Sequence, residues 1–249
     1  MTTGFLITAR MKSTRLPRKL TLDLLGKRVI DWQIERVKQT TRIDRIVVCT
    51  SINPQDDILE TIAHDHAVEC FRGSEDDVLL RLMEAAKANQ CDYVVNITAD
   101  CPLVSPEWID NTVDEFRQTN ADFIRALDLP HGFFSYGLKP AALRQACELK
   151  RDQNTEVWGR YFTDSGAFQV VDLAVPTHLQ RPDFRLTLDY PEDYEFFHQV
   201  FSHYGEEIVR REVAEIITYL DAHPEVVSIN AHCAAAYQKR WNLQNRLNL

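Results

Sequence analysis

Short apolar runs that alternate with helical patterns constrain the fold of this chain more than any other feature of its sequence. Four such runs, at 5–7, 46–49, 68–71 and 93–97, are rich in β-branched and aromatic residues and indicate buried strands. The intervening segments carry helical apolar spacing or a helix-start signal, at 28–39, from Asn53–Pro54, at 75–89 and from Ser105–Pro106. Strands that alternate with helices form right-handed βαβ units, so the sequence predicts an α/β fold with a mostly parallel central sheet flanked by helices.

The alternation becomes irregular after residue 121. Further strands are expected at 122–126, 168–171 and 184–188, with an irregular hairpin at 131–139. Helices are expected at 140–149, 153–164, 191–204, 209–220 and 230–246, the last with Trp241 available to dock on the body or on a partner subunit. No linker rich in Gly, Ser or Pro divides the sequence. We therefore expect one domain over 1–249, with 125–185 as a smaller subdomain or lid and 205–249 as a C-terminal helical region.

A basic segment follows the first expected strand. Residues 9–19 contain five cations and no acid in a chain of formal net charge -9, namely Arg10, Lys12, Arg15, Arg18 and Lys19. Like charges at this density repel one another, and open α/β sheets bind their ligands at the carboxyl ends of strands. The segment therefore predicts a polyphosphate site, with a solvated basic loop as the alternative.

The third expected strand ends in Arg72-Gly73-Ser74. Gly73 would let the backbone approach a ligand closely, and Ser74 offers both a donor and an acceptor. The alternative is a helix start, with Ser74 as the cap and Asp77 at the third helical position. Ligand contact and capping are compatible.

Two aspartates follow expected strands in the same way. Asp100 could hold Mg²⁺ between itself and phosphate oxygens, or could close a turn before Pro102. Asp189 could be a second metal ligand, or could cap the helix at 191–204 with Glu192 completing a capping box. Spacing alone favours the cap for Asp189.

Composition and missing motifs exclude several classes of protein. The acidic balance argues against a nucleic-acid binder, because nonspecific binding needs a broad basic face. The sequence contains neither G-x-x-x-x-G-K-[ST] nor G-x-G-x-x-G, which disfavours a P-loop kinase and a dinucleotide oxidoreductase. No signal peptide and no apolar run of about 18 residues is found, so no membrane partner is expected. The six scattered cysteines are typical of reduced thiols in a cytoplasmic protein.

Four motifs together resemble the cytidylyltransferase family that makes CMP-activated acidic sugars, especially its spore-coat-polysaccharide (SpsF-like) branch. Residues 9–19, ARMKSTRLPRK, look like the family's nucleotide loop A-R-x-x-S-x-R-L-P-x-K. Residues 71–79 are similar to the branch's F-R-G-S-E-D-D-V-L, residues 97–103 to I-T-x-D-C-P-L, and residues 186–193 to x-T-x-D-x-P-E-D. The four stand in family order and cover the chain from about residue 3 to 205.

The resemblance implies a Rossmann-like nucleotidyltransferase fold, Mg²⁺ as cofactor and a homodimer. It implies that the phosphates of the nucleotide bind Arg10, Ser13, Arg15 and Lys19, and that the base and ribose lie near Arg72, Gly73 and Ser74. Ala9 and Asp100 are further nucleotide contacts that it implies. It places Mg²⁺ on Asp100 and Asp189, and it assigns catalysis to Arg10, Lys19 and Asp100. The expected reaction transfers CMP from CTP to an acidic sugar or a phosphorylated small acceptor, with release of pyrophosphate, for surface polysaccharide synthesis.

Two segments depart from the family pattern. Residues 131–139 lack the acidic strand usual in the branch, and 154–158 lack the histidine of the family's R-E-H-V-T. Polar and basic residues in this half could bind an anionic acceptor, namely Arg125, His131, Lys139, Glu156, Arg160 and Arg185. Because the acceptor region is altered, two alternatives remain: a CDP-linked non-sugar product, or a nucleotide-binding regulatory module without activity.

Overall fold

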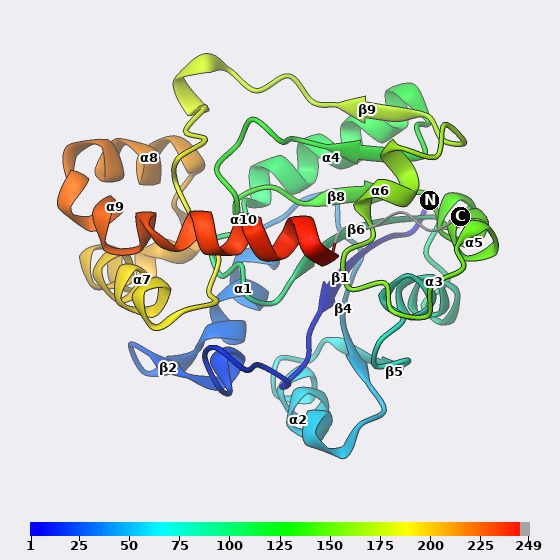
Figure 1. Cartoon of the computed structure of the whole chain (residues 1–249), viewed down its shortest axis with the longest axis horizontal. Coiled ribbons are helices and arrows are strands. Elements are labelled where there is room, and N and C mark those ends of the chain that lie inside the picture. The colour runs from blue at the N-terminus through cyan, green and yellow to red at the C-terminus, as the bar shows by residue number, and fades with distance from the viewer. Residues whose placement is uncertain (245–249) are drawn as a thin grey trace.

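A seven-stranded mixed sheet forms the centre of the molecule (Figure 1). The computed structural model describes the backbone of residues 1–244 and the side chains of residues 1–239. In spatial order the strands are β5 (Glu69–Gly73), β4 (Arg45–Ser51), β1 (Thr3–Thr8), β6 (Tyr93–Thr98), β8 (Tyr136–Leu138), β7 (Phe123–Arg125) and β9 (Val170–Asp172). A separate small ribbon pairs β2 (Asp23–Leu24) with β3 (Lys27–Arg28). The predicted α/β fold with a mostly parallel sheet is confirmed.

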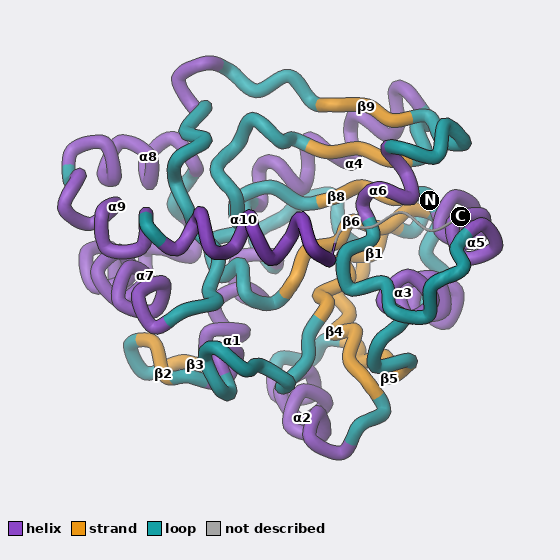
Figure 2. Tube along the Cα trace, in the orientation of Figure 1, coloured by secondary structure: helices purple, strands orange, loops and turns teal. Residues whose placement is uncertain are grey.

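Four neighbouring strands of the main sheet, β5, β4, β1 and β6, are parallel to one another. β1 lies between β4 and β6, with Leu6 opposite Val47 on one side and Asn96 on the other (Figure 2). At the carboxyl edge Thr8 is opposite Thr98. This register brings the loops that follow β1 and β6 to the same edge of the sheet.

Helices cover both faces of the sheet. The helices are α1 (Val29–Val37), α2 (Asp57–Asp65), α3 (Val78–Ala88), α4 (Pro106–Thr119), α5 (Pro140–Leu149), α6 (Gly159–Thr163), α7 (Pro191–Tyr204), α8 (Val213–Ala222), α9 (Pro224–Ala231) and α10 (Cys233–Gln244). Successive residues of a strand point to opposite faces. Phe5 and Ile7 therefore pack with α1, α2 and α4, whereas Leu6 packs with α3 and α5. All three side chains are fully buried, as expected for a strand covered on both sides.

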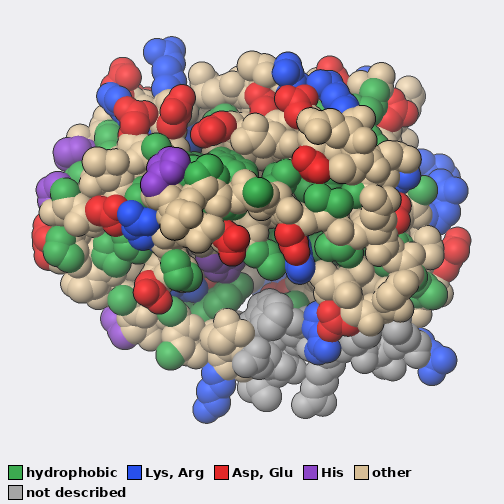
Figure 3. All heavy atoms as spheres, turned by 90° about the horizontal axis from the view of Figure 1, so that it is seen from above, with side chains coloured by type: hydrophobic (Ala, Val, Ile, Leu, Met, Phe, Trp, Pro, Cys, Tyr) green, Lys and Arg blue, Asp and Glu red, His purple; other side chains and the backbone are tan. Residues whose placement is uncertain are grey.

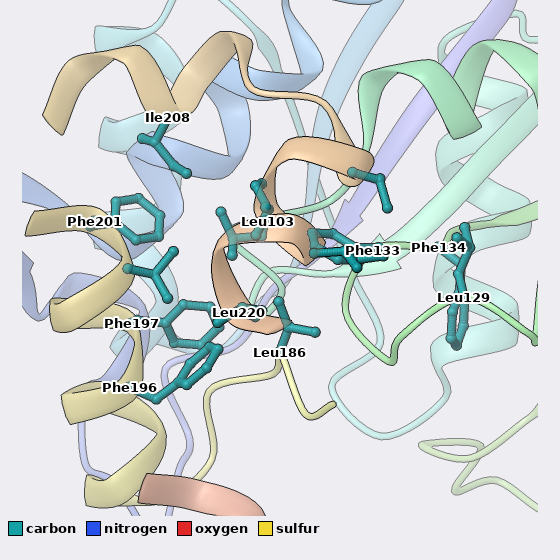
Figure 4. Packing of buried hydrophobic residues seen from close by; sticks show 14 of the residues in the cluster. Leu103, Leu129, Phe133, Phe134, Leu186, Phe196, Phe197, Phe201, Ile208 and Leu220 are labelled. Carbon is teal, nitrogen blue, oxygen red and sulfur yellow. The ribbon is translucent and has the colours of Figure 1, made fainter. Parts of the chain in front are cut away.

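A third hydrophobic cluster joins the C-terminal helices to the body. Phe196, Phe197 and Phe201 of α7 point toward Leu186 and Ile208 (Figure 4). Trp32 of α1 packs edge-on against Phe201, with 5.1 Å between ring centroids. Burial of several aromatic rings in one place makes this cluster a large part of the apolar core.

Polar contacts also tie α1 to the C-terminal region. The fully buried Arg36 donates hydrogen bonds to the carbonyl oxygens of Val104 at 2.9 Å, Ile208, and Arg211 at 3.0 Å. Ile208 lies in a 3₁₀ turn over Gly205–Arg210 that precedes α8. One side chain thus supplies the donors for three backbone acceptors on two distant segments.

The helix expected at 153–164 is wrong in extent, because only Gly159–Thr163 is helical. Contacts with the start of α3 hold residues 153–158 in a loop. The Thr155 hydroxyl donates to Asp77 Oδ1 and accepts from the backbone N–H of Leu79, each at 2.9 Å. The Thr155 N–H donates to the carbonyl oxygen of Asp76 at 3.0 Å. These long-range hydrogen bonds replace the local helical ones.

The strand expected at 184–188 and the hairpin expected at 131–139 are also wrong. Residues 136–138 of that hairpin form β8, which pairs antiparallel with β6 and β7. Residues 184–188 make a single bridge, between His131 and Arg185. The N–H groups of Leu186 and Leu188 donate to the carbonyl oxygens of His131 and Asp100, each at 2.8 Å. The segment therefore links two loops without extending the sheet.

Two expected helix caps are displaced. Asp77, not Ser74, caps α3 by accepting from the N–H of Leu80 at 3.1 Å, while Ser74 Oγ accepts from the N–H of Asp77. Asp193 completes the capping box of α7, so neither Asp189 nor Glu192 has the expected capping role. In both cases the side chain that caps the helix belongs to an aspartate in a run of acidic residues. Residue type alone does not predict which residue of such a run has the capping role.

The C-terminal region is divided into more elements than expected. The stretch at 209–220 contains the end of the 3₁₀ turn and most of α8, and the tail forms α9 and α10. The predicted docking of Trp241 concerns a side chain outside the described residues. Within the described residues no helix is long and apolar enough to cross a membrane. Acidic and basic side chains are interspersed on the face seen in Figure 3.

Candidate active site

The loop that follows β1 lines a cavity of about 280 Å³ at the carboxyl edge of the sheet. Side chains from seven separate regions of the chain surround this main cavity: Arg10, Lys12, Ser13, Thr14, Arg15, Lys19, Asp76, Thr98, Asp100, His131, Asn154, Glu156, Val157, Thr187, Asp189 and Tyr237. The basic segment and both candidate metal ligands are thus brought together. Neighbouring β1 and β6 contribute two of these regions directly, because their ends are in register.

Lys19 lies between the two aspartates. Its Nζ donates to Asp100 Oδ2 at 2.5 Å and to Asp189 Oδ1 at 2.9 Å. Burial on its own would lower the pKa of Lys19, but the charges of Asp100 and Asp189 outweigh burial and raise it. Lys19 is therefore a fixed positive charge between two carboxylates that are far apart in sequence.

Asp189 is held in place by arginines. Arg15 Nη2 donates to Asp189 Oδ1 at 2.6 Å, and Arg185 Nη2 donates to Asp189 Oδ2 at 3.0 Å. Burial would raise the pKa of Asp189, but Lys19, Arg15 and Arg185 outweigh burial and hold it well below its usual range. Asp189 is thus ionised at any ordinary pH.

Arg185 is a buried support behind the cavity. It donates to both carboxylate oxygens of Asp193, at 2.9 and 3.0 Å, in addition to its bond with Asp189. Asp193 in turn accepts from the backbone N–H groups of Asp189 and Tyr190, at 2.8 and 3.0 Å. This network fixes the backbone that carries Asp189, so Arg185 acts on the cavity through Asp189.

Asp100 is held less tightly than Asp189. Its carboxylate accepts from the Thr98 hydroxyl and from Lys19. Its own carbonyl oxygen accepts from the N–H of Leu188 at 2.8 Å, which brings the segment after β6 against the segment before α7. That backbone contact is what places the two aspartates together.

The two aspartates form a donor set suited to a divalent cation. Both carboxylates lie within hydrogen-bond distance of the same ammonium nitrogen, so they already converge on one cation. Carboxylate oxygens are the ligands that Mg²⁺ prefers, and Mg²⁺ usually takes only one or two of them from a protein. The residues present therefore fit this ion.

Arg10 lines both the main cavity and the smaller cavity beside it. Its Nη2 lies 3.1 Å from Glu156 Oε1, and its Nη1 donates to the carbonyl oxygen of Glu75 at 3.2 Å. Lys12 Nζ lies 3.4 Å from Glu75 Oε1. Ala9 is buried and its N–H donates to the carbonyl oxygen of Cys49 at 3.1 Å, which anchors the start of the loop to β4.

A smaller cavity of about 110 Å³ adjoins the main one and contains a residue that the sequence reasoning missed. Arg81 of α3 lines it and is fully buried. Its Nη1 donates to the carbonyl oxygens of Ser74 and Glu75, whereas its Nε and Nη2 have no hydrogen-bond partner among the described residues. Fully buried arginines are rare unless paired, so a ligand with acceptor atoms would satisfy this residue. The sequence signal that could have identified Arg81 is its place between the apolar positions Leu79 and Leu82 of the helical pattern.

Tyr237 is a second missed residue. It comes from α10, which runs across the front of the sheet in Figure 1. Its ring lies 5.3 Å from the His131 ring and 4.8 Å from the Arg185 guanidinium. Burial and the nearby charge of Arg185 lower the pKa of His131, so its imidazole is neutral at pH 7. No local pattern in the sequence places residue 237 beside residue 131.

Several residues expected at the site lie away from both cavities. Arg72 makes ion pairs with Asp57 at 2.7 Å and Glu60 at 3.1 Å, and neither Arg72, Gly73 nor Ser74 is among the described lining residues. Three expected acceptor residues form ion pairs elsewhere, namely Arg125 with Asp172, Lys139 with Asp122, and Arg160 with Asp164. His131 and Glu156 do line the main cavity. The roles assigned to all these residues remain predictions.

Similarity to known proteins agrees with this arrangement. The cytidylyltransferase family model matches residues 5–214. The chain is 31% identical over 233 residues to the spore coat polysaccharide biosynthesis protein SpsF of Bacillus subtilis (strain 168), which covers 90% of this chain and 96% of that protein. It is 32% identical over 166 residues to the 3-deoxy-manno-octulosonate cytidylyltransferase of Chlorobium chlorochromatii (strain CaD3), which covers 64% of this chain and 62% of that protein.

The fold has a close match among solved structures. A cytidylyltransferase from Leptospira borgpetersenii serovar Hardjo-bovis (strain JB197) superposes with a TM-score of 0.83 at 27% identity, covering 91% of this chain and 97% of that one. Together with the family match over residues 5–214, this match shows that the chain belongs to the cytidylyltransferase family of nucleotidyltransferases.

Proposed function

We propose that this chain is a Mg²⁺-dependent enzyme that transfers CMP from CTP to an acidic sugar or a phosphorylated small molecule and releases pyrophosphate. The observation that carries the proposal is the convergence of Asp100 and Asp189 on Lys19, in a cavity that the basic loop 9–19 lines. A triphosphate with a divalent cation has the charges that such a site complements.

The residues of the basic loop would bind the triphosphate. Arg10, Arg15 and Lys19 supply positive charge to its oxygens, and Ser13 supplies a hydroxyl donor. When phosphate oxygens arrive, Lys19 and Arg15 would exchange their carboxylate partners for them. This exchange would free Asp100 from Lys19 and would free Oδ1 of Asp189, whose Oδ2 stays bonded to Arg185. The two aspartates would hold Mg²⁺, which when bound neutralises charge on the phosphate oxygens.

The reaction needs little covalent work from the protein. An oxygen of the acceptor attacks the α-phosphorus of CTP, a new P–O bond forms, and the bond to the bridging oxygen of pyrophosphate breaks. Arg10 and Lys19 stabilise the charge that develops on the transferred and leaving groups, and the loop holds them in line. Catalysis on this view comes from position and charge.

The small cavity would bind the base. Arg81 has two buried donors without a partner among the described residues, which suits the carbonyl oxygen and ring nitrogen of a pyrimidine. The main cavity, with His131, Glu156 and Tyr237, would bind the acceptor. The name of the Bacillus relative, a spore coat polysaccharide biosynthesis protein, supports a sugar acceptor used for surface polysaccharide.

A pyrophosphate-release assay tests the proposal. The enzyme is supplied with Mg²⁺ and each of CTP, UTP, ATP and GTP, together with a panel of acidic sugars and phosphorylated small acids. We expect release with CTP and at least one member of the panel, and loss of release when the ion is chelated. Equal turnover of ATP, or release that ignores chelation, would contradict it.

Two segments that depart from the family pattern favour one alternative function, that of a regulatory nucleotide-binding module without catalytic activity. Residues 131–139 and 154–158, which contribute His131 and Glu156 to the main cavity, depart from the family pattern, as expected if chemistry has been lost. A regulatory nucleotide-binding module would be stabilised by CTP and yet release no pyrophosphate with any acceptor. A CDP-linked non-sugar product is the nearer alternative, and product analysis with the phosphorylated acids of the panel identifies it.

A further inference from the structure

Three side chains with metal-binding chemistry meet outside the cavities, where α7 begins and α10 begins. Glu192 lies in the first turn of α7, His232 follows the end of α9, and Cys233 opens α10. One donor atom from each side chain lies within 4.8 Å of the others. His232 Nε2 is 3.6 Å from Glu192 Oε1 and 3.7 Å from Cys233 Sγ.

The elements that carry these donors are fixed to each other. The Asn230 side chain donates to the carbonyl oxygen of Arg185 and to Asp193 Oδ1, each at 2.9 Å. Asp193 is the residue after Glu192, and Asn230 is two residues before His232. The hydrogen bond therefore holds the end of α9 against the first turn of α7, and the three donors are preorganised.

Two of the three distances between the donors are close to those of a tetrahedral zinc site, and the third is within 4.8 Å. Zinc bonds of about 2.0 Å to nitrogen or oxygen and about 2.3 Å to sulfur give donor-to-donor distances of about 3.3 to 3.6 Å. The distances of 3.6 and 3.7 Å from His232 Nε2 are close to these values before any ion contracts them. The exposed fraction of the His232 side chain is 65%, so an ion can reach the site, whereas Cys233 is buried.

We infer that Glu192, His232 and Cys233 bind Zn²⁺ or a chemically similar divalent ion, with water as the fourth ligand. A thiolate and an imidazole select this class of ion over Mg²⁺, which prefers oxygen ligands. The site is thus chemically separate from the aspartates of the main cavity. An ion bound here fastens the start of α10 to α7, and α10 carries Tyr237 into the main cavity.

Cobalt binding to the full-length protein tests the inference. Co²⁺ replaces Zn²⁺ in such sites and gives a thiolate-to-cobalt charge-transfer band, whereas a site built from carboxylates does not. Excess Mg²⁺ is present to occupy the aspartates. We expect the band at one equivalent of Co²⁺, its loss when Zn²⁺ is added, and its loss in Cys233→Ser. In His232→Gln, we expect binding at least tenfold weaker.

Two matched variants serve as controls. Cys70→Ser removes a half-buried thiol on β5, and His64→Gln removes an exposed imidazole on α2; both should keep the band. Because His232 is mostly exposed, its variant retains the fold, and circular dichroism checks this. A wild-type protein without the band, or a band that survives Cys233→Ser, would overturn the inference. None of these readouts depends on CTP turnover, so the inference and the proposed function fail separately.

Discussion

Substitution of Asp100 is the most direct test of the proposed chemistry at the scale of one residue. Its carboxylate is held by Thr98 and Lys19 alone among the described side-chain oxygen and nitrogen donors, so it can exchange partners without disturbing the fold. We expect Asp100→Asn to lower CTP-dependent pyrophosphate release about a hundredfold, or about 3 kcal/mol of transition-state stabilisation. Steady-state assays with Mg²⁺ check this, with Asp65→Asn on the surface of α2 as the control. Near wild-type turnover in Asp100→Asn would remove this residue from the site.

Asp31 gives a prediction about acid stability. It accepts from the N–H and guanidinium of Arg28 and lies 2.9 Å from His66 Nε2. Burial would raise the pKa of Asp31, but the bonds from His66 and Arg28 outweigh burial and lower it from 3.8 to about 2. Because the folded pKa is depressed, this stabilisation is present above pH 3.8 and is lost as the pH falls toward 2.

The matching experiment is Asp31→Asn with urea unfolding at several pH values. We expect the variant to be less stable by about 2 kcal/mol near neutral pH, from the size of the pKa shift. The difference should narrow as the pH falls from 3.8 toward 2, because Asp31 of the unfolded wild-type chain becomes protonated first and that of the folded protein follows. A difference that is constant with pH would mean that the charge of Asp31 does not contribute.

Arg36 supplies the hydrogen bonds by which α1 holds the C-terminal region. Its removal leaves the carbonyl oxygens of Val104, Ile208 and Arg211 without this donor. We expect Arg36→Met to lower the free energy of unfolding by about 3 kcal/mol. Urea unfolding measures the loss, and Arg117→Met on the exposed end of α4 should change stability by less than about 0.5 kcal/mol. Equal effects in the two variants would contradict the role given to Arg36.

Elements set by local patterns could be predicted, and elements set by distant partners could not. The apolar run at 5–7 is a strand because both faces are covered, and its composition indicates this. Residues 153–158 have a helical composition, but Thr155 bonds to Leu79 and Asp77 more than seventy positions away. The segment at 184–188 has strand composition and yet bonds to two loops. Propensity gives way to tertiary contacts in both cases.

At the scale of the whole molecule, the site is assembled from seven regions of the chain. Motif order predicted that the loop after β1 and the two aspartates belong together, and the structure brings them into one cavity. Arg81 and Tyr237 were missed because their importance comes from burial and from the path of α10, neither of which is written in neighbouring residues. Arg72 was expected near the ligand from its motif, but it bonds to α2.

Ligand binding should stabilise the whole domain. A ligand present at a hundred times its Kd adds about 2.7 kcal/mol to stability, which corresponds to about 5 °C or more in Tm for a domain of this size. We expect CTP with Mg²⁺ to produce such a shift in a thermal melt, and chelation of the ion to reduce it. ATP with Mg²⁺ is the control. An equal shift with ATP would argue against a pyrimidine site beside Arg81.

The ammonium of Lys19 is a counter-ion that the resting protein carries for itself. The carboxylates of Asp100 and Asp189, which both bond to this ammonium, would repel each other without it. The positive charge of Lys19 keeps them together before any substrate binds. A free divalent ion must compete with that charge and so gains little by entering alone. An ion that arrives on a nucleotide brings anions that attract the lysine away. If the proposed function holds, this ion pair would favour a divalent ion and a nucleotide that enter together over an ion that enters alone.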